Sequence, residues 1–295
     1  MNIGYGVLDH PIHKARTWIP LEIEEFRRRG HHVVPIARGR ENELRQEIRN
    51  LDFIVCHFSK RAMQIRRLGV PFGIISHARG IWINNGEWLK GASIHPKCKW
   101  VGYISNYHKD IYNKWGIDKP LIHTPVSINT ELFKRTKPIG DKVLCGARHI
   151  AKKGLDIAIK AYPNIYCWGE GPLTSKLKTI SNKTTFTGWL SNDELIELMN
   201  DSWLYVFPGI KLPNGDMDGQ PTTIKEAMAM ELQIISTPIA GTAELPHIHF
   251  VNADVNEVRD KIQSIKHESN ISGRDYVLKN FHPSIIVDNI LEAIE

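Results

Sequence analysis

Short apolar runs rich in β-branched residues alternate with helix-like segments along the whole chain of 295 residues. Strands that are apolar throughout, rather than at every second position, are typical of parallel sheets covered by helices on both faces. The alternation therefore predicts an α/β fold with doubly wound sheets, which bind ligands at the carboxyl ends of their strands. The predicted strands are 2–8, 32–37, 52–58, 71–76, 100–105, 142–147, 164–169, 183–188, 203–209 and 232–237, and the helices between them include 17–29 and 59–68.

A change of composition divides the chain into two halves. The stretch 133–142, FKRTKPIGDK, is charged, carries Pro and Gly, and separates two series of strands. A chain of this length suffices for two domains with well-buried cores. We therefore predict two domains, residues 1–138 and 139–280, with ligands bound at the strand ends and in the cleft between them.

The two halves differ in charge. Residues 1–138 hold 23 Lys and Arg against 12 Asp and Glu, whereas residues 139–295 hold 15 against 20. The positive half suggests an anionic partner, which would be nucleic acid, anionic lipid or an anionic glycan. The alternative is a solvated basic face formed by Arg27, Arg28, Arg29, Arg45, Arg49, Arg66 and Arg67.

Several classes of protein are not expected. The sequence has no run of 18 apolar residues that would span a membrane, and its start is expected to be a first strand rather than a secretory signal. The cysteines form no C-x-x-C pair, so neither a zinc site nor a disulfide framework is expected, and a reducing cytoplasm fits best. Three of them lie in apolar strand-like runs and Cys98 does not; the four are Cys56, Cys98, Cys145 and Cys167.

The turn after the predicted strand 142–147 carries cations. Arg148 follows the strand, and Lys153 with Gly154 opens the next helix. The amino-terminus of a helix binds anions through its free N–H groups and its dipole. A guanidinium fork beside an ammonium suits a diphosphate. The alternative is an ordinary loop with surface cations.

The stretch DGQPTTIKEAMA, residues 218–229, places one acidic residue before a Gly-Gln-Pro turn and a second eight positions later. Taken alone, Asp218 would be a helix cap, Pro221 a first helical residue and Glu226 a solvated side chain. Two other stretches, WGEGP (168–172) and FTGWLSNDELIELMNDSW (186–203), each join a strand to a helix through a glycine turn. The helix of the longer stretch is predicted to be capped by Ser191 or Asn192.

In order and spacing, residues 139–250 resemble the retaining GT-B glycosyltransferases of glycosyltransferase family four. That family reads G-R-x-x-x-x-K-G, then G-x-G-P, then G-[FWY]-[VL]-[ST], then an acid, G-x-P and a Glu eight places after the acid. The matching segments are 146–154, 169–172, 188–191 and 218–226. The resemblance implies two Rossmann-like domains facing across a cleft, with residues 281–295 as a helix that crosses back to the first.

The resemblance also implies roles for single residues. Arg148 and Lys153 match the pair that binds the donor diphosphate and stabilises the leaving nucleotide as its charge grows. Asp218 matches the acid that contacts the donor sugar. The backbone that holds the sugar with it belongs to Gly219, Gln220 and Pro221.

Three further positions complete the implied site. Glu226 matches the residue that binds the ribose hydroxyls. The turn of Gly188, Trp189 and Leu190 matches the one that brackets the nucleobase through backbone groups. In the first half the resemblance is weaker, and its best match is IISHARGIW (74–82), where His77 takes the place of a histidine that faces the donor sugar.

The chain departs from the family in three places. Asp218 stands where the family usually has Glu, which leaves the transferred sugar open. Residues 231–233 are Glu-Leu-Gln where the family prefers Gly-x-Pro. The loop 8–16 lacks the family's glycines, and the residues left to replace their phosphate contact are Asp9, His10 and His13.

No metal is expected. The stretch DMD (216–218) looks like a D-x-D metal motif, but it precedes G-x-P, and GT-B enzymes generally need no metal for chemistry. HIH (247–249) and HH (31–32) have no carboxylate or cysteine at ligand spacing and are interpreted as strand or surface histidines.

The implied activity is retaining, metal-independent transfer of a sugar from a nucleotide diphosphate sugar, a UDP-sugar first, to an acceptor hydroxyl. No permanently bound cofactor and no stable protein partner are expected. The acceptor is either a lipid-linked or surface glycan at an anionic membrane or a modified DNA base, as in phage-type enzymes. The rival interpretations are a catalytically degenerate nucleotide-sugar-binding protein that acts through a partner and a nucleotide-sugar epimerase.

Overall fold

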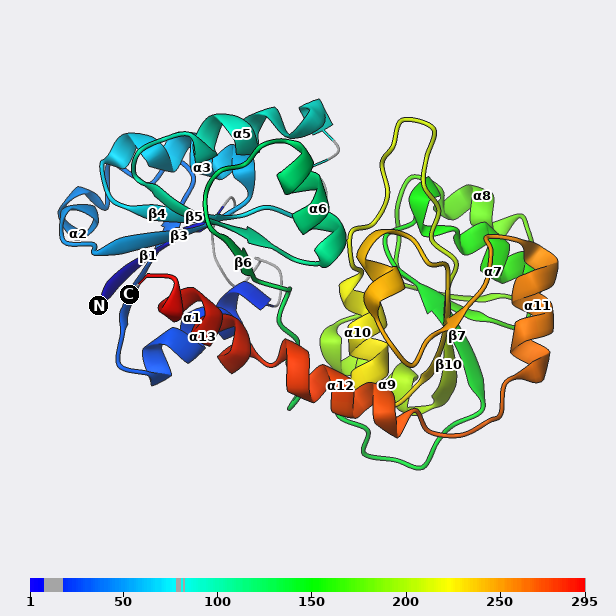
Figure 1. The fold of residues 1–295 in the computed structure, drawn as a ribbon. Coiled ribbons are helices and arrows are strands. Elements are labelled where there is room, and N and C mark those ends of the chain that lie inside the picture. The colour runs from blue at the N-terminus through cyan, green and yellow to red at the C-terminus, as the bar shows by residue number, and fades with distance from the viewer. Residues whose placement is uncertain (8–17, 78–80, 82, 295) are drawn as a thin grey trace. The chain divides into compact units, whose positions relative to one another are not determined.

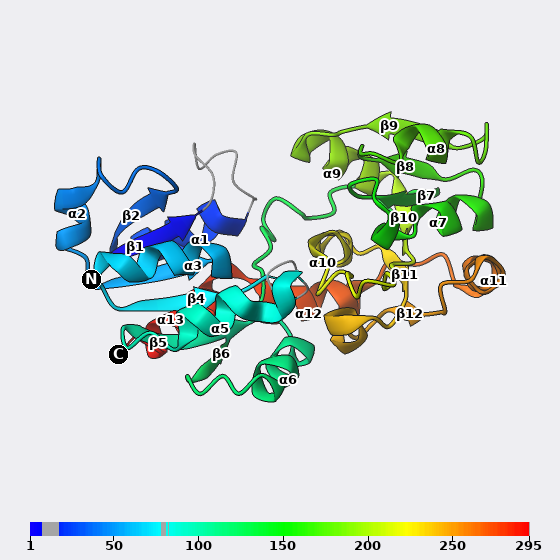
Figure 2. The ribbon, with the colours of Figure 1, turned by 90° about the horizontal axis from the view of Figure 1, so that it is seen from above.

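A computed structural model describes residues 1–7, 18–77, 81 and 83–294. The chain forms two compact units, shown as ribbons in Figures 1 and 2. The first unit consists of residues 1–129 together with 281–295, and the second of residues 130–280. Across the described part of the chain, no helix is long and apolar enough to cross a membrane.

The first unit is built on a six-stranded sheet in the order β2-β1-β3-β4-β5-β6, in which every recorded strand pair is parallel. The strand order reverses between β1 and β3, which makes this the switch point where doubly wound sheets bind ligands. The strands are β1 (Asn2–Val7), β2 (His32–Ala37), β3 (Phe53–His57), β4 (Phe72–Ile75), β5 (Cys98–Tyr103) and β6 (Leu121–His123).

Helices cover both faces of this sheet (Figure 1). α1 and α13 lie side by side on one face, where Ile23 and Phe26 of α1 share a core with Ile286 and Ile290 of α13. The other helices pack on the opposite face around Phe72. The helical segments are α1 (Trp18–Arg28), α2 (Arg45–Arg49), α3 (Ser59–Ile65), η2 (Arg66–Leu68), η3 (Ile83–Gly86), α5 (Glu87–Ser93), α6 (Asn106–Lys114) and α13 (Pro283–Glu292).

The second unit repeats this architecture with a six-stranded sheet in the order β12-β11-β10-β7-β8-β9, again with every recorded pair parallel. Its switch point lies between β7 and β10, because the chain leaves β7 toward β8 and returns on the other side. The strands are β7 (Lys142–Gly146), β8 (Tyr166–Trp168), β9 (Thr185–Gly188), β10 (Ser202–Phe207), β11 (Gln233–Ser236) and β12 (His249–Phe250).

The second sheet is also covered on both faces (Figures 1 and 2). α7 and α11 share one core cluster with the strands, while α9 and α10 pack on the other face of β10. The helical segments are η4 (Ala151–Lys153), α7 (Leu155–Ala161), α8 (Thr174–Lys178), α9 (Asn192–Asn200), α10 (Thr222–Ala229), η5 (Ala240–Glu244), α11 (Val255–Ser264) and α12 (Ile271–Phe281).

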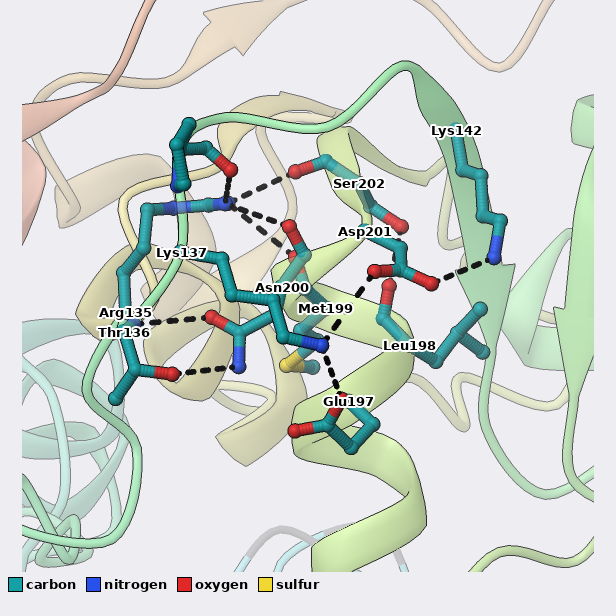
Figure 3. A network of polar contacts seen from close by, with 11 residues as sticks. Arg135, Thr136, Lys137, Lys142, Glu197, Leu198, Met199, Asn200, Asp201 and Ser202 are labelled. Carbon is teal, nitrogen blue, oxygen red and sulfur yellow. Dashed lines mark hydrogen bonds and ion pairs between the residues drawn. The ribbon is translucent and has the colours of Figure 1, made fainter.

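The two units part between Asn129 and Thr130, whereas the composition break suggested 138/139. The difference arises from Arg135, whose guanidinium is committed to the second unit (Figure 3). It donates hydrogen bonds to the carbonyl oxygens of Met230 (2.9 Å), Asn200 (2.9 Å), Met199 (3.2 Å) and Ser202 (2.8 Å). Because this fork holds the connecting segment against α9 and β10, the charged stretch belongs to the second unit.

The last segment of the chain packs on the first unit. α13 lies against α1, and the Arg29 guanidinium joins them by an ion pair to Asp288 and a 2.9 Å hydrogen bond to the Ser284 carbonyl. This segment places Asp288 at the basic end of α1, and its acidic residues lower the net charge of the unit. The first unit as folded holds 20 Lys and Arg against 14 Asp and Glu, and the second holds 18 of each.

The predicted strands all exist, with ends that differ by a few residues. The prediction that Cys98 lies outside a strand is wrong, because Cys98 begins β5 and is buried. Two lysines, Lys97 and Lys99, flank Cys98, so the apolar pattern starts only at Trp100. Ser191 caps α9 in a capping box with Glu194, which decides between the two predicted caps.

Candidate functional site

The candidate site of the second unit lies at the carboxyl edge of its sheet. All of its strands run parallel, so the turns that follow them gather at one edge. Arg148 follows β7, Gly169 follows β8, Trp189 follows β9, and the loop 208–221 follows β10. The sequence motifs therefore meet on one rim of the sheet although they are dispersed along the chain.

The turn after β7 approaches the end of β10 closely. Gly154 has φ 63°, and a Cβ atom there would lie 1.9 Å from the carbonyl oxygen of Pro208. Only glycine fits both the left-handed conformation and this contact. Lys153, directly before it, is thereby placed at the switch point between β7 and β10, with its Nζ 5.2 Å from the centre of the Phe207 ring.

Lys153 and Asp218 form an ion pair at this switch point. The Nζ of Lys153 lies 2.8 Å from Oδ2 of Asp218, and the two side chains are only 15% and 14% exposed. The Asp218 Oδ2 atom is buried, and among the described residues it has no partner with hydrogen-bond geometry. The pair is thus an electrostatic contact whose carboxylate oxygen retains capacity to accept a hydrogen bond.

Lys152 holds the loop that carries Asp218. Its Nζ lies 2.9 Å from Asp216 Oδ1, 3.8 Å from Asp218 Oδ1 and 3.4 Å from the Met217 carbonyl oxygen. The Lys152 carbonyl accepts a 2.9 Å hydrogen bond from the Ile210 amide. Both carboxylates of the DMD stretch are therefore engaged by lysines, and no described group of three or more metal-ligating side chains exists to hold a metal ion.

Arg148 is exposed beside a rigid turn. His149, the next residue, is fully buried, and its Nδ1 lies 2.9 Å from Thr174 Oγ1. The His149 amide donates to the Glu170 carbonyl, which ties the end of β7 to the turn after β8. No ion pair or side-chain hydrogen bond within the described structure engages the Arg148 guanidinium. This cation is therefore available to an anion at the rim.

The stretch 219–221 forms a closed turn before α10. The Gly219 carbonyl accepts a 2.7 Å hydrogen bond from the Gly241 amide, and Gln220 Nε2 lies 3.3 Å from the Gly241 carbonyl. Gln220 is buried, and its Oε1 has no hydrogen-bond partner among the described atoms. Like Asp218 Oδ2, this oxygen is a buried acceptor that a hydroxyl group would satisfy.

The start of α10 differs from the simplest interpretation of the sequence. Asp218 does not cap the helix, and Pro221 is the cap residue, with φ −61° and ψ 127°, rather than the first helical residue. Pro221 offers no side-chain acceptor, so no side chain caps the first turn. The amide groups of that turn are unsatisfied donors, which suit an anion or a hydroxyl oxygen.

Glu226 lies one turn further into α10 and is 9% exposed. Burial raises the pKa of its carboxyl from 4.5 to about 7, and the charge of Lys225 partly opposes this rise. Within the described structure no hydrogen bond or ion pair of the Glu226 carboxylate is recorded. A buried acid whose pKa lies near neutrality is typical of a functional site.

The turn after β9 presents an aromatic side chain. Gly188 has φ 73°, and its carbonyl accepts a 2.7 Å hydrogen bond from the Gly169 amide. Trp189 is 68% exposed and meets the buried Trp168 edge to face, with ring centres 6.3 Å apart. Leu190 is half-buried. The family resemblance implied backbone contacts here, but an exposed indole on a buried one also offers a stacking surface.

His77 belongs to the first unit, just after β4, and is 8% exposed. Its Nε2 lies 3.1 Å from Nδ1 of His57, and its ring lies between Trp18 and Phe58 at centre distances of 5.6 and 4.7 Å. Nothing in the sequence pointed to His57, because a histidine at the end of an apolar strand resembles a core residue. Asp9, His10 and His13 lie outside the described residues.

The geometry brings most of the predicted residues of the second unit to one rim. Lys153 and Asp218 are in contact, and Glu226 follows on the helix that begins after Asp218. Sequence reasoning missed Lys152 as the tether of the loop. Its signal was the Lys-Lys pair set against two aspartates in DMD, which offers one ammonium for each carboxylate.

Comparison with known proteins gives the family context. Residues 140–267 match the family described as Glycosyl transferases group 1. A curated Escherichia coli (strain K12) protein, named for a glycosyltransferase of colanic acid biosynthesis, WcaL, is 27% identical over 270 residues, or 79% of this chain. The chain covers 64% of the length of that relative.

Solved structures match this chain over the length of both units. HepE from Anabaena, solved in complex with UDP, has a TM-score of 0.76 at 14% identity, covering 100% of this chain and 99% of that chain. Sucrose-phosphate synthase from Thermosynechococcus elongatus has a TM-score of 0.79 at 14% identity, covering 99% and 98%. Because both structures are only 14% identical to this chain, the likeness establishes its fold alone.

Proposed function

We propose that this chain transfers a sugar from a nucleotide diphosphate sugar to an acceptor hydroxyl. The premise is that it has the GT-B fold and carries a glycosyl transferases group 1 domain at residues 140–267. The donor is a UDP-sugar, since HepE was solved with UDP. The transfer retains the anomeric configuration and needs no metal, and the leaving phosphate helps to deprotonate the acceptor hydroxyl. No covalent protein nucleophile takes part.

The observation that carries the proposal is the ion pair of Lys153 and Asp218 at the switch point between β7 and β10. A donor diphosphate that enters this rim takes Lys153 as its counter-ion, and Arg148 adds a guanidinium fork. Asp218, released from the lysine, then accepts a hydroxyl of the donor sugar. Both cations stabilise the charge that grows on the nucleotide as the glycosyl bond breaks.

The same rim offers contacts for the rest of the donor. The Gly219–Pro221 turn and the uncapped first turn of α10 provide amides and the buried Gln220 Oε1 for sugar hydroxyls. Glu226 accepts the ribose hydroxyls. The nucleobase lies at the turn of Gly188 to Leu190, where Trp189 adds an exposed ring.

The first experiment is calorimetric titration with UDP, GDP and ADP, followed by an assay for hydrolysis of the matching nucleotide sugars. Lys153→Ala and Lys152→Ala form a matched pair, because both remove one ammonium from the same turn but only Lys153 is assigned to the diphosphate. We expect Lys153→Ala to lower turnover at least about tenfold, since a charged hydrogen bond is worth roughly 1.5–3 kcal/mol. Lys152→Ala should lower turnover less, because it only loosens the loop 208–221.

Two results would contradict the assignment. Wild-type turnover in Lys153→Ala would exclude it from the diphosphate site. Equal losses in both variants would mean that the lysines act only by holding the loop 208–221. Thermal unfolding of each variant distinguishes a lost donor contact from a lost fold. Bound donor raises the melting temperature by mass action, so a folded variant that has lost only the contact shows a smaller rise than wild type.

We assign the acceptor to a lipid-linked or surface glycan. The relative WcaL is named for the biosynthesis of colanic acid, and a second curated protein from Erwinia amylovora, AmsK, is named for that of amylovoran. The net positive charge of the first unit suits an anionic acceptor at a membrane surface. A modified DNA base is the alternative acceptor that the same charge allows.

A catalytically degenerate nucleotide-sugar-binding protein is the second candidate function. This candidate was suggested by the departures from the family pattern at residues 231–233 and in the loop 8–16. At residue 233 the fold accommodates the change, because Gln233 Nε2 donates to the Glu268 carbonyl at 3.0 Å and Gln233 Oε1 lies 3.0 Å from His249 Nε2. Donor binding without donor hydrolysis or transfer would favour this candidate over the enzyme.

A further inference from the structure

The indole of Trp168 carries a buried hydrogen-bond donor at the rim of the second sheet. Trp168 is the last residue of β8, and its side chain is 6% exposed. The Nε1–H group is buried, yet among the described residues it has no hydrogen-bond partner. Buried donors in folded proteins are nearly always bonded, and ligands of parallel sheets bind at the carboxyl edge. An unbonded donor at this edge is therefore suited to a ligand.

The packing of the indole on Gly146 shows where this donor lies. Gly146 is the last residue of β7 and pairs with Trp168 in the sheet. A Cβ atom on Gly146 would lie 2.3 Å from Cδ1 and 2.5 Å from Nε1 of the indole. The pyrrole edge of the ring therefore lies directly against this glycine, and a side chain there would displace it. The indole N–H is held at the end of β7, two residues before Arg148.

Tyr205 of β10 connects the same end of β7 to α10. Its hydroxyl donates a 2.6 Å hydrogen bond to the Gly146 carbonyl and lies 3.1 Å from Thr223 Oγ1 in the first turn of α10. Burial raises the pKa of Tyr205 well above its usual value, and the nearby Glu226 carboxylate adds to the rise. The glycine that supports the Trp168 indole is thus tied to the helix that carries the residue assigned to the ribose.

On its other side, Trp168 meets the turn assigned to the nucleobase. Trp189 of that turn lies edge to face with Trp168, at a centre distance of 6.3 Å. β8 lies between β7 and β9 in the sheet, so Trp168 stands between the cationic turn of Arg148 and the turn that carries Trp189. A nucleoside diphosphate that contacts both turns would cross the end of β8.

A second buried tryptophan shows that the position of Trp168 matters as much as its burial. Trp100 Nε1 also lacks a partner among the described residues, and its side chain is 1% exposed. However, Trp100 lies three residues before the end of β5 in the first unit, stacked on Phe53 in an apolar core. Trp100 therefore provides the same kind of buried N–H away from the end of a strand.

We propose that the Trp168 Nε1–H group donates a hydrogen bond to an oxygen atom of the bound nucleoside diphosphate. This inference rests on the proposed function, because it takes the ligand of the rim to be a nucleotide. The acceptor is a phosphate oxygen on the Arg148 side or a carbonyl oxygen of the base on the Trp189 side. An indole is an uncharged donor only, so the contact adds affinity without any change of protonation.

Proton–nitrogen-15 NMR of the indole groups in the full chain tests this contact directly. Trp168→Phe assigns the Trp168 signal among those of the eight tryptophans, and triple-resonance assignment of the wild type replaces it if that variant does not fold. On titration with UDP, or with GDP or ADP if calorimetry shows that one of them binds instead, we expect this signal to move downfield as the hydrogen bond forms. The shift should saturate with the dissociation constant from calorimetry, while the Trp100 signal stays in place.

Two fragments of the nucleotide distinguish the acceptors. Inorganic pyrophosphate alone should reproduce the shift of the Trp168 signal if the acceptor is a phosphate oxygen. The matching nucleoside alone, uridine in the case of UDP, should reproduce it if the acceptor is a carbonyl oxygen of the base.

Trp168→Phe and Trp203→Phe form a matched pair, since each removes one buried indole from the second sheet, but Trp203 lies near the opposite end of its strand. The loss of one uncharged hydrogen bond should weaken nucleotide binding about threefold to tenfold in Trp168→Phe. Trp203→Phe should bind the nucleotide as the wild type does. Thermal unfolding of both variants without nucleotide measures the loss of packing that they share.

The outcomes separate this inference from the proposed function. A Trp168 signal that stays in place while calorimetry shows bound nucleotide would overturn the inference and leave the proposed function standing. Equal affinities of Trp168→Phe and Trp203→Phe for the nucleotide would also overturn it, because the indole N–H would then add nothing beyond packing. A wild-type chain that binds none of UDP, GDP and ADP would refute the proposed function, and the inference with it.

Discussion

Glu226 is the residue whose ionisation links the structure to pH. Burial raises the pKa of this carboxyl to about 7, so the folded chain keeps a proton that the unfolded chain releases near pH 4.5. Stability from this group is therefore fully present below about pH 4.5 and is lost as the pH rises toward 7. An ionised Glu226 then persists in a buried position with no recorded partner, which favours binding of a hydroxyl donor there.

This gives a prediction for donor binding. If ribose hydroxyls donate to Glu226, they stabilise its ionised form, so the affinity for a nucleotide sugar should rise between about pH 6 and pH 8 with release of a proton. Glu226→Gln should bind more weakly at pH 8 and show little pH dependence. Calorimetry in two buffers of different ionisation enthalpy measures the proton release. The same slope with pH in wild type and Glu226→Gln would rule out Glu226 as the titrating group.

At the scale of the element, the carboxyl end of α10 contains one departure from the family, the Glu at position 231. The Glu231 amide donates to the Met228 carbonyl at 2.9 Å, and the Leu232 amide donates to the Ala227 carbonyl at 3.0 Å. These two bonds form a Schellman motif, which requires a left-handed residue after the helix. Glu231 takes that conformation with φ 61°, at the position where the family prefers glycine.

The strain predicts a stabilising substitution. A non-glycine residue in the left-handed region costs roughly 1 kcal/mol, so Glu231→Gly should raise the unfolding free energy by about that amount. For a unit of this size the melting temperature should rise by about 2–4 °C, as measured by calorimetry. Glu231→Ala is the control, because it removes the carboxylate and keeps the strain. Equal effects of both variants would assign the gain to charge rather than to backbone conformation.

At the scale of the whole molecule, folding redistributes the charge that the sequence suggested. The first 138 residues carry a large positive excess, but the acidic segment 281–295 joins their unit, and the residues 130–138 leave it. The cluster at the end of α1 is also partly committed. Arg28 and Arg29 share Glu25, Arg29 pairs with Asp288, and Arg27 donates to the Val33 carbonyl at 3.2 Å. The cluster is therefore not an uncommitted basic face.

A matched pair of arginines tests whether the remaining charge serves the acceptor. Arg28 has a side chain that is 69% exposed, whereas Arg29 is 21% exposed and ties α1 to α13. If an anionic acceptor binds by charge, Arg28→Gln and Arg29→Gln should weaken acceptor use similarly, leave donor binding intact, and resemble a rise in salt from about 0.05 to 0.2 M. A loss only in Arg29→Gln would instead indicate damage to the α1–α13 contact.

The salt series also separates the acceptors. Binding to DNA should fall steeply on a log–log plot through counterion release. Binding to a membrane should depend on the anionic lipid content, at about 1 kcal/mol per basic residue near the surface. Acceptor kinetics that respond to neither salt nor the two variants would point to a neutral sugar acceptor.

The sequence by itself determined ten of the strands and their order, but not the short edge strands β6 and β12. Continuous apolar runs predicted both parallel sheets, because a strand buried on two faces must be apolar at every position. Ser191 and Asn192, as alternative caps, indicated the start of α9, and the glycine turns marked the strand ends that carry Arg148, Lys153 and Asp218. These signals are local, since backbone conformation and burial period depend on a few adjacent residues.

Only the tertiary structure decided which side chains meet. The Lys153–Asp218 pair depends on β10 returning beside β7, and the buried contacts of Tyr5 with Glu22 and His57 depend on β1, α1 and β3 converging at one place. Nothing local distinguishes Glu22 or His57 from ordinary helix and strand residues. Their contacts join residues far apart in the chain, which the crossovers of the sheet bring together and which the periodicity of the sequence does not reveal.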